Sequence, residues 1–268
     1  MPYTGRVANL KRSWNEIAPH YGRRYRISTA TVHYGPLSPG DDKLRLLGDI
    51  SGLGALDLGC GGGQNAIALS RMGAHVTAVD FSVRQIEEAR LLAEKNDADI
   101  KFHVADIDQL PALKSDSFDL VISVCVIAFI RNERAVFNEA FRLLKPGGRL
   151  FLSDMHPLQY ILDEKRRGVE FSSAYPFEPI RMRWRWEFGN DSRGGPVEAG
   201  FEHYVRSVPH YCNALIDSGF TIARILEPKP TSRSPHRGFS EEIMREYPYI
   251  ARHLPITFII GARKGRKT

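Results

Sequence analysis

A glycine-rich turn between a strand-like run and a helix-like run most constrains what this chain can fold into. The stretch LDLGCGGGQNAIAL, residues 56–69, places four glycines in five positions after an apolar run and before helix-forming residues. Glycines let the backbone turn tightly and let another molecule approach it, while the helix N-terminus offers free N–H groups. The pattern predicts a nucleotide-like ligand at the edge of a parallel sheet.

The residues around this turn alternate between strand and helix patterns. Ser82 and Gln85 form a capping-box pattern that opens the helix expected at 83–95. The other expected helices are 65–72 and 134–144, and the expected strands are 55–59, 75–80, 101–106, 118–124 and 149–154. Such alternation predicts an α/β fold with a parallel sheet and helices on both faces.

The alternation of strand and helix patterns ends after Asp154. Residues 182–188, MRWRWEF, have period-two alternation, which predicts a strand of a lid with its tryptophans on one face and its arginines toward solvent. A helix is expected at 207–218, ended by Gly219. Late strands are expected at 220–228 and 255–264.

Composition excludes several classes of protein. No apolar run reaches the length of a membrane span, and the first residues lack the apolar stretch of a secretory signal. Three scattered cysteines suggest reduced thiols, so a cytoplasmic location is expected. The net charge is +6, yet residues 51–157 hold 11 Lys or Arg against 14 Asp or Glu, so the basic excess lies outside the glycine-rich part. Such an excess fits a solvated surface, an acidic substrate or a nucleic acid.

Two ligand classes compete for the glycine-rich turn. Dinucleotide-binding proteins have Gly-x-Gly-x-x-Gly/Ala, where the last small residue keeps the helix close to the strand. Gln64 occupies that last position here, and no phosphate-loop Gly-Lys-Ser/Thr follows. A nicotinamide oxidoreductase is therefore disfavoured.

Asp57, Gly59, Gly61 and Gly63 instead resemble the first motif of class I S-adenosylmethionine-dependent methyltransferases. The resemblance implies a Rossmann-like, seven-stranded, mostly parallel sheet with an antiparallel last strand and a lid inserted after strand five. It implies S-adenosyl-L-methionine as cofactor, which carries no phosphate. The cofactor-binding residues implied after the next strands are Asp80 for the ribose hydroxyls, Phe81 beside it, Asp106 for the adenine amino group, Ile107 near the ring, and Ser123.

A second resemblance concerns residues 14–25, WNEIAPHYGRRY, which look like the N-terminal segment of the small-molecule branch, akin to quinone and natural-product methyltransferases of secondary metabolism. It implies that Tyr21 and Tyr25 touch the methionine end of the cofactor. The expected division is a helical cap at 1–50, a cofactor-binding core at 51–155, a substrate lid at 156–206 and completion of the sheet at 207–268.

Methyl transfer from a sulfonium chiefly requires a nucleophile held in line, with a base nearby and no metal. Many family members carry histidines after the fourth strand, but residues 124–132 contain none. His156, after the fifth strand, is therefore the predicted catalytic base. The predicted substrate-contacting residues are His33, Tyr34, Trp184, Trp186 and His203.

The predicted function is methyl transfer to O, N or C of a small molecule. Two alternatives stay open. A nucleic-acid methyltransferase is favoured by the basic excess but lacks an Asn/Asp-Pro-Pro-Tyr/Phe motif and a Pro-Cys nucleophile. A non-methylating binding protein or cyclase on the same fold is left open by the missing histidines.

Overall fold

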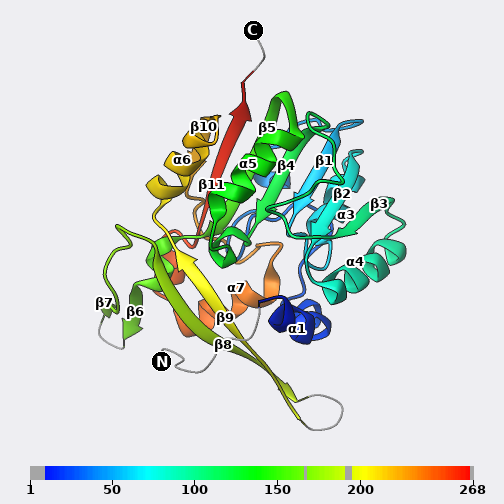
Figure 1. Cartoon of the computed structure of the whole chain (residues 1–268). Helices are drawn as coiled ribbons and strands as arrows, with labels where there is room; N and C mark the ends of the chain where they lie inside the picture. Colours follow the sequence, from blue (N-terminus) through cyan, green and yellow to red (C-terminus); the bar gives the residue numbers. More distant parts are fainter. Residues whose placement is uncertain (1–9, 166–167, 191–194, 266–268) are drawn as a thin grey trace.

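A seven-stranded sheet forms the centre of the molecule (Figure 1). The computed structural model describes residues 10–165, 168–190 and 195–265. The strands of this sheet are β1 (Gly54–Leu58), β2 (His75–Asp80), β3 (Ile100–Val104), β4 (Phe118–Val124), β5 (Leu144–Met155), β10 (Phe220–Leu226) and β11 (Thr257–Lys264). Their order is β3-β2-β1-β4-β5-β11-β10. Strands β1 to β5 pair in parallel, and β11 is antiparallel to β5 and β10. The predicted Rossmann-like sheet with an antiparallel last strand is confirmed.

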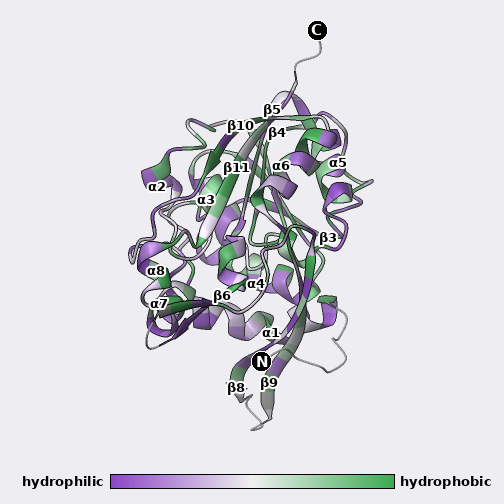
Figure 2. Ribbon diagram, turned by 90° about the vertical axis from the view of Figure 1, so that its left-hand side faces the viewer, coloured by the Kyte–Doolittle hydropathy of each residue, from purple (hydrophilic) through white to green (hydrophobic). Residues whose placement is uncertain are grey.

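Helices cover both faces of the sheet, and each face has its own core. Helices α5 (Glu133–Leu143) and α6 (Val208–Asp217) pack on one face, and α3 (Gln64–Arg71) and α4 (Val83–Lys95) on the other. The pleat of β4 divides its side chains accordingly, with Val121 in the first core and Leu120 and Ile122 in the second. Because the central strands of the sheet are buried on both faces, their sequences are nearly continuous apolar runs. Figure 2 shows apolar residues concentrated on these strands.

Side-chain caps fix where several helices begin. The Ser82 hydroxyl accepts a hydrogen bond from Gln85 N, so α4 begins where its capping pattern predicted. Asn132 and Ser207 cap α5 and α6 in the same way. These local signals explain why the helix boundaries in this half of the chain agree with the sequence to within one residue.

A cover of different construction lies across the carboxyl ends of the parallel strands. It consists of α1 (Leu10–Tyr25) and the antiparallel hairpin of β8 (Ile180–Asn190) and β9 (Pro196–Val205), which projects below the sheet in Figure 1. The α1 residues pack against one face of the hairpin through the apolar cluster of Ile17, Trp14, Phe201 and their neighbours. The predicted strand at 182–188 is thus part of a two-stranded ribbon.

The remaining elements are short. They are α2 (Asp41–Leu44), η1 (Ile127–Phe129), η2 (Pro157–Tyr160), β6 (Leu162–Lys165), β7 (Gly168–Phe171), α7 (Arg237–Glu246) and α8 (Ile250–His253). Strands β6 and β7 form a second small hairpin. None of the described helices is both long and apolar enough to cross a bilayer.

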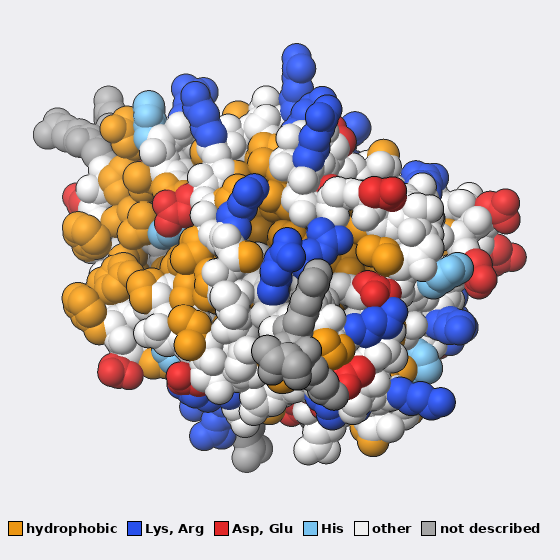
Figure 3. Space-filling view, turned by 90° about the horizontal axis from the view of Figure 1, so that it is seen from above, with side chains coloured by type: hydrophobic (Ala, Val, Ile, Leu, Met, Phe, Trp, Pro, Cys, Tyr) orange, Lys and Arg blue, Asp and Glu red, His pale blue; other side chains and the backbone are white. Residues whose placement is uncertain are grey.

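The arginines of β8 lie on the face opposite the tryptophans. Arg181 and Arg183 pair with Glu202, and Arg185 pairs with Glu198, so this outer face is charged but locally balanced. At the far end of the molecule, seen from above in Figure 3, Lys and Arg side chains gather with a few Asp and Glu. This view looks at the amino ends of the parallel strands, so part of the basic excess lies away from the cover.

Candidate active site

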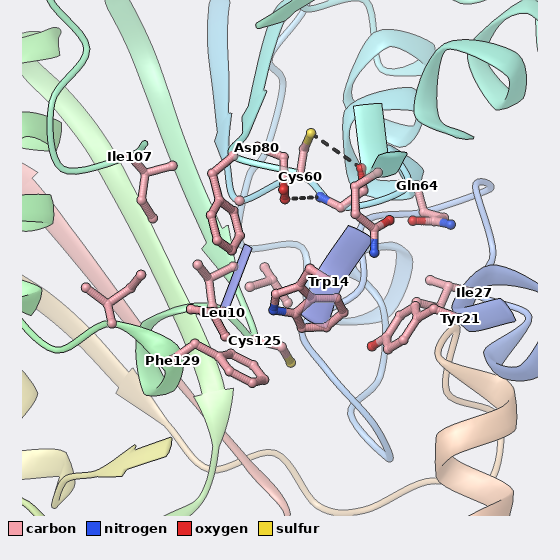
Figure 4. Close-up of a pocket in the computed structure, with 18 of the residues that line it drawn as sticks. Leu10, Trp14, Tyr21, Ile27, Cys60, Gln64, Asp80, Ile107, Cys125 and Phe129 are labelled. Carbon is pink, nitrogen blue, oxygen red and sulfur yellow. Dashed lines mark hydrogen bonds between the residues drawn. The ribbon is translucent and has the colours of Figure 1, made fainter. Parts of the chain in front are cut away.

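A cavity lies between the carboxyl ends of β1, β2 and β4 and the cover (Figure 4). Its empty space is about 1050 Å³, the open mouth included. The strand order reverses between β1 and β4, and ligands of such sheets bind at that reversal. Among the described residues that line it there is no Lys or Arg, whereas Asp80, Asp106 and Asp108 contribute carboxyl groups.

The glycine-rich turn forms the floor of this cavity. Gly59 has φ +74°, and a Cβ there would lie 2.6 Å from Val126 Cγ2. Gly63 has φ +80°, and a Cβ there would lie 2.9 Å from Ala89 Cβ of α4. Left-handed backbone and close neighbours together require glycine at both positions. Gly59 and Gly61 line the cavity, while Gly63 caps α3 and lets α4 approach.

Asp80 ends β2 and faces the cavity, as its position in the sequence suggested. Its Oδ2 accepts from Gly61 N at 3.0 Å and its Oδ1 from Ser82 N at 2.9 Å, which fixes the carboxylate beside the turn. Each oxygen keeps a further lone pair for a ligand hydroxyl. Burial raises the pKa of Asp80 to about 6, so the group is mainly ionised at neutral pH.

Asp57 lies behind the turn and not in the cavity lining. It is buried on β1, and its Oδ2 has no hydrogen-bond partner among the described residues. Burial, followed by repulsion from Asp80, raises its pKa to about 7. This placement does not support direct contact with a bound cofactor.

The other residues predicted to bind cofactor divide between lining and supporting positions. Phe81, Asp106, Ile107 and Tyr21 line the cavity. Ser123 does not, since its hydroxyl is turned to the main chain and donates to Leu58 O. Tyr25 is fully buried beneath Tyr21 with the two rings 4.7 Å apart, so it supports the wall without forming it.

The cover supplies an aromatic wall opposite the turn. Trp14 packs edge-on against Tyr21, Phe129 and Trp186, with ring centroids 5.4–6.2 Å apart. Trp14, Tyr21 and Phe129 reach the cavity surface, as Figure 4 shows. Edge-to-face pairs of this kind favour a dry, apolar surface.

His156, the predicted base, caps η2 and does not line the cavity. Its Nδ1 accepts from Leu158 N at 3.2 Å, and its Nε2 lies 3.0 Å from Glu227 Oε1. Burial lowers its pKa, an effect that Glu227 opposes. Because both ring nitrogens already have partners in the fold, this geometry argues against His156 as the base.

The predicted substrate residues also have separate positions. His33 lines the cavity. Tyr34 does not; it is buried and donates to Asp41 Oδ1 at 2.7 Å. Trp184, Trp186 and His203 lie one layer behind Phe129 and Trp14 on the inner face of the hairpin. His203 is buried with neither ring nitrogen bonded to a described residue, and burial lowers its pKa to about 3.

Several lining residues were not expected from the sequence. Besides Trp14 and Phe129, they include Leu10, Ile27, Gln64, Gln85, Cys125, Ile130 and His236. Gln85 follows from the capping pattern, since a residue in the first turn of α4 must lie near the end of β2. His236 carries no such signal, because it reaches the cavity from a loop more than 200 residues away from α1.

A buried ion pair joins the cover to the sheet. Arg206, just after β9, bonds Glu133 Oε2 at 2.7 Å, and both side chains are almost fully buried. Its guanidinium also donates to the carbonyls of Ile130 and Arg131, in the loop that follows η1. This clamp sets the position of the loop from which Phe129 and Ile130 face the cavity.

Part of the chain is similar in sequence to known methyltransferases. Residues 50–175 match a family model described as a methyltransferase domain. A ubiquinone biosynthesis O-methyltransferase of Xanthomonas oryzae is 35% identical over 108 residues, which are 40% of this chain and 45% of that protein. The chain therefore spans less than half the length of the curated relatives it matches.

Solved structures share most of the fold at lower identity. An S-adenosylmethionine-dependent methyltransferase from Mesorhizobium loti is 24% identical, with TM-score 0.62, covering 82% of this chain and 95% of that one. The 4+2 cyclase SpnF is 17% identical, with TM-score 0.62, covering 98% of both chains. Residues 50–175 thus match a methyltransferase domain, and the chain has the Rossmann-like fold of S-adenosylmethionine-dependent methyltransferases.

Proposed function

We propose that this protein transfers a methyl group from S-adenosylmethionine to an uncharged small-molecule acceptor, with a hydroxyl oxygen as the first candidate atom. The observation that carries the proposal is the buried Asp80 carboxylate beside the Gly59–Gly63 turn, at the point where the strand order reverses. The curated relatives are O-methyltransferases by name, which supports the choice of oxygen.

The residues of the cavity fit the cofactor by their chemistry. Asp80 has unused acceptor capacity for two ribose hydroxyls, and Asp106 with Ile107 offers an acceptor and an apolar surface for adenine. The glycine turn and Tyr21 would hold the methionine part. In this proposal, residues 51–155 bind the cofactor, residues 207–268 complete the sheet, residues 1–50 cap the cofactor and residues 156–206 form the substrate lid.

The acceptor would lie against the aromatic wall. Trp14, Tyr21 and Phe129 present ring surfaces, and none of the described lining residues carries a permanent positive charge. An anionic acceptor such as a nucleic acid would therefore meet carboxylates without a compensating cation. These residues favour a neutral, partly aromatic molecule.

The chain itself would act mainly by positioning and by excluding water. The bound cofactor supplies a methyl group on a positively charged sulfur, which is a good leaving group. The cover closes the cavity with packed rings, so a nucleophile held there meets the methyl carbon without competition from water.

Calorimetry with S-adenosylhomocysteine tests the proposal. Asp80→Asn should weaken binding roughly 10- to 150-fold, because hydrogen bonds to a charged group contribute about 1.5–3 kcal/mol. Asp99→Asn makes the same charge change at an exposed position and should bind like the wild type. Absence of binding to the wild type, or equal affinities in Asp80→Asn and the wild type with both folded, would overturn the proposal.

A cyclase that keeps the cofactor pocket is the second candidate, favoured by the full-length likeness to SpnF. The two functions differ in mass balance. Incubation with cofactor and a small-molecule extract should give products 14 mass units heavier than their precursors, with release of S-adenosylhomocysteine. Products of unchanged mass without that release would favour the cyclase.

A further inference from the structure

Two histidines from distant parts of the chain meet at the cavity surface. His33 follows α1, and His236 precedes α7. The two segments are joined by a β-bridge between Ile27 and His236 and by a hydrogen bond from Ser28 N to Pro235 O. The two imidazole rings lie edge to face with centroids 5.3 Å apart.

Both rings are buried at the cavity surface. His33 is 8% exposed and His236 is 2% exposed, and both line the cavity. The Nδ1 atom of each is buried without a hydrogen-bond partner among the described residues. Buried polar atoms in folded proteins are nearly always bonded, so the pair indicates a place where a polar group of a ligand completes the structure.

The position of His33 is fixed between the two strands where the strand order reverses. Its main chain exchanges two hydrogen bonds with the side chain of Asn65, at the start of α3. Two residues later, a Cβ at Gly35 would lie 3.2 Å from Cys125 Sγ, just after β4. His33 therefore lies between the glycine turn and the β4 end, where the proposed methyl donor would meet its acceptor.

We propose that the His33–His236 pair faces the acceptor hydroxyl and takes its proton during methyl transfer. This role rests on the proposed function. In the step, the acceptor O–H proton moves to a free imidazole nitrogen, and an oxygen lone pair forms the bond to the methyl carbon. The carbon–sulfur bond pair stays on sulfur, which becomes neutral, and the imidazolium later releases its proton to water.

Charge conservation in the cavity favours this assignment. Burial, followed by repulsion from His236, lowers the pKa of His33, and burial lowers the pKa of His236 to about 4. Both rings are thus neutral at pH 7. Loss of the sulfonium charge and gain of an imidazolium leave the net charge of the cavity unchanged, so the step adds no net charge to the buried site.

Few other titratable groups border the pair. Tyr21 and Tyr25 face it from α1, Cys125 follows β4, and Asp80 lies across the cavity on β2. Burial raises the pKa of each of these four groups, so the tyrosines and the cysteine stay neutral. The ion pairs Arg24–Glu242 and Arg26–Glu241, which join the end of α1 and the residue after it to α7, are each of zero net charge.

Histidine side-chain NMR tests the assignment without a known acceptor. Titrations compare ¹⁵N-labelled protein saturated with S-adenosylmethionine and with S-adenosylhomocysteine, with signals assigned from His33→Gln and His236→Gln. The pKa of the pair should be roughly one to two units lower in the complex with the positively charged compound. The signals of His75, which is exposed, serve as the reference and should be the same in both complexes at each pH.

The outcomes separate this inference from the proposed function. Equal pKa values of the pair in two saturated complexes would overturn the inference alone. Failure of both compounds to bind would overturn the proposed function and the inference with it. Loss of more than tenfold in S-adenosylhomocysteine affinity in folded His33→Gln or His236→Gln would assign the pair to holding the cofactor and also overturn the inference. Affinities within threefold of wild type support it.

Discussion

The two walls of the cavity are built in opposite ways. The wall at the strand ends consists of tight turns, main-chain hydrogen bonds and buried carboxyl groups such as Asp80. The opposite wall consists of packed rings from the cover and from η1. The first wall has fixed positions for a polar ligand of one shape, whereas the second offers apolar area that different side chains could supply. This difference suggests that the strand-end wall determines the cofactor and the cover determines the acceptor.

Breaking the buried Arg206–Glu133 ion pair should have the largest effect on stability. Arg206→Met leaves Glu133 as a buried charge paired only with His210 and leaves loop carbonyls without a donor, so we expect a loss of about 3–5 kcal/mol in the free energy of unfolding. Urea denaturation measures this loss. Arg84→Met removes an exposed pair with Glu87 and should cost less than about 0.5 kcal/mol. Similar losses of unfolding free energy in the two variants would show that Arg206 does not hold the cover to the rest of the protein.

A smaller but specific loss is expected at the strand-end wall. Gly59→Ala adds a Cβ against Val126 in left-handed backbone, which should cost about 2–4 kcal/mol of unfolding free energy. Gly61 has φ +50°, but the new Cβ of Gly61→Ala would meet only Gln85 Oε1, at an ordinary contact distance of 3.9 Å, so a loss of about 1 kcal/mol is expected. Thermal unfolding of both variants, analysed with one common enthalpy of unfolding, gives the two losses of unfolding free energy. If Gly61→Ala were the more destabilised, the close approach at Gly59 would not matter.

The smallest predicted effect concerns pH. Burial raises the pKa of Asp154, at the end of β5, to about 6. The folded protein then binds more protons than the unfolded chain between pH 4 and pH 6, so stability falls as pH rises through this range. From pH 5 to pH 7 this carboxyl should account for a loss of about 1 kcal/mol. Asp154→Asn should remove this part of the pH dependence, which urea titrations at pH 5 and pH 7 measure. An unchanged difference in unfolding free energy between the two pH values would contradict the prediction.

Much of the strand-end wall could be predicted because its signals are local. The turn at Gly59–Gly63, the cap at Ser82 and the carboxylate at Asp80 each follow from a few neighbouring residues, and the structure has them where the sequence indicated. The position of His156 could not be predicted in this way. Its neighbours placed it at the correct end of β5, but whether its ring turns to the cavity or to Glu227 depends on a residue 71 positions later.

The cover was predicted only in outline. Alternation in residues 182–188 identified β8, but β9 was not recognised, because Gly200 and the charged residues around it dilute the pattern. Trp184 and His203, on the inner face of the hairpin, lie behind Trp14 and Phe129 and not at the cavity surface. Which ring lies in front depends on how α1 packs on the hairpin.

The sequence by itself determined the sheet, the glycine turn and the acidic strand ends, because backbone conformation and capping are decided by adjacent residues. Only the tertiary structure decided which side chains from distant segments line the cavity. His33 and His236 lie 203 positions apart, and long-range packing of the segments around them brings their rings to 5.3 Å. No local pattern encodes such a meeting, since it depends on the packing of every element between the two.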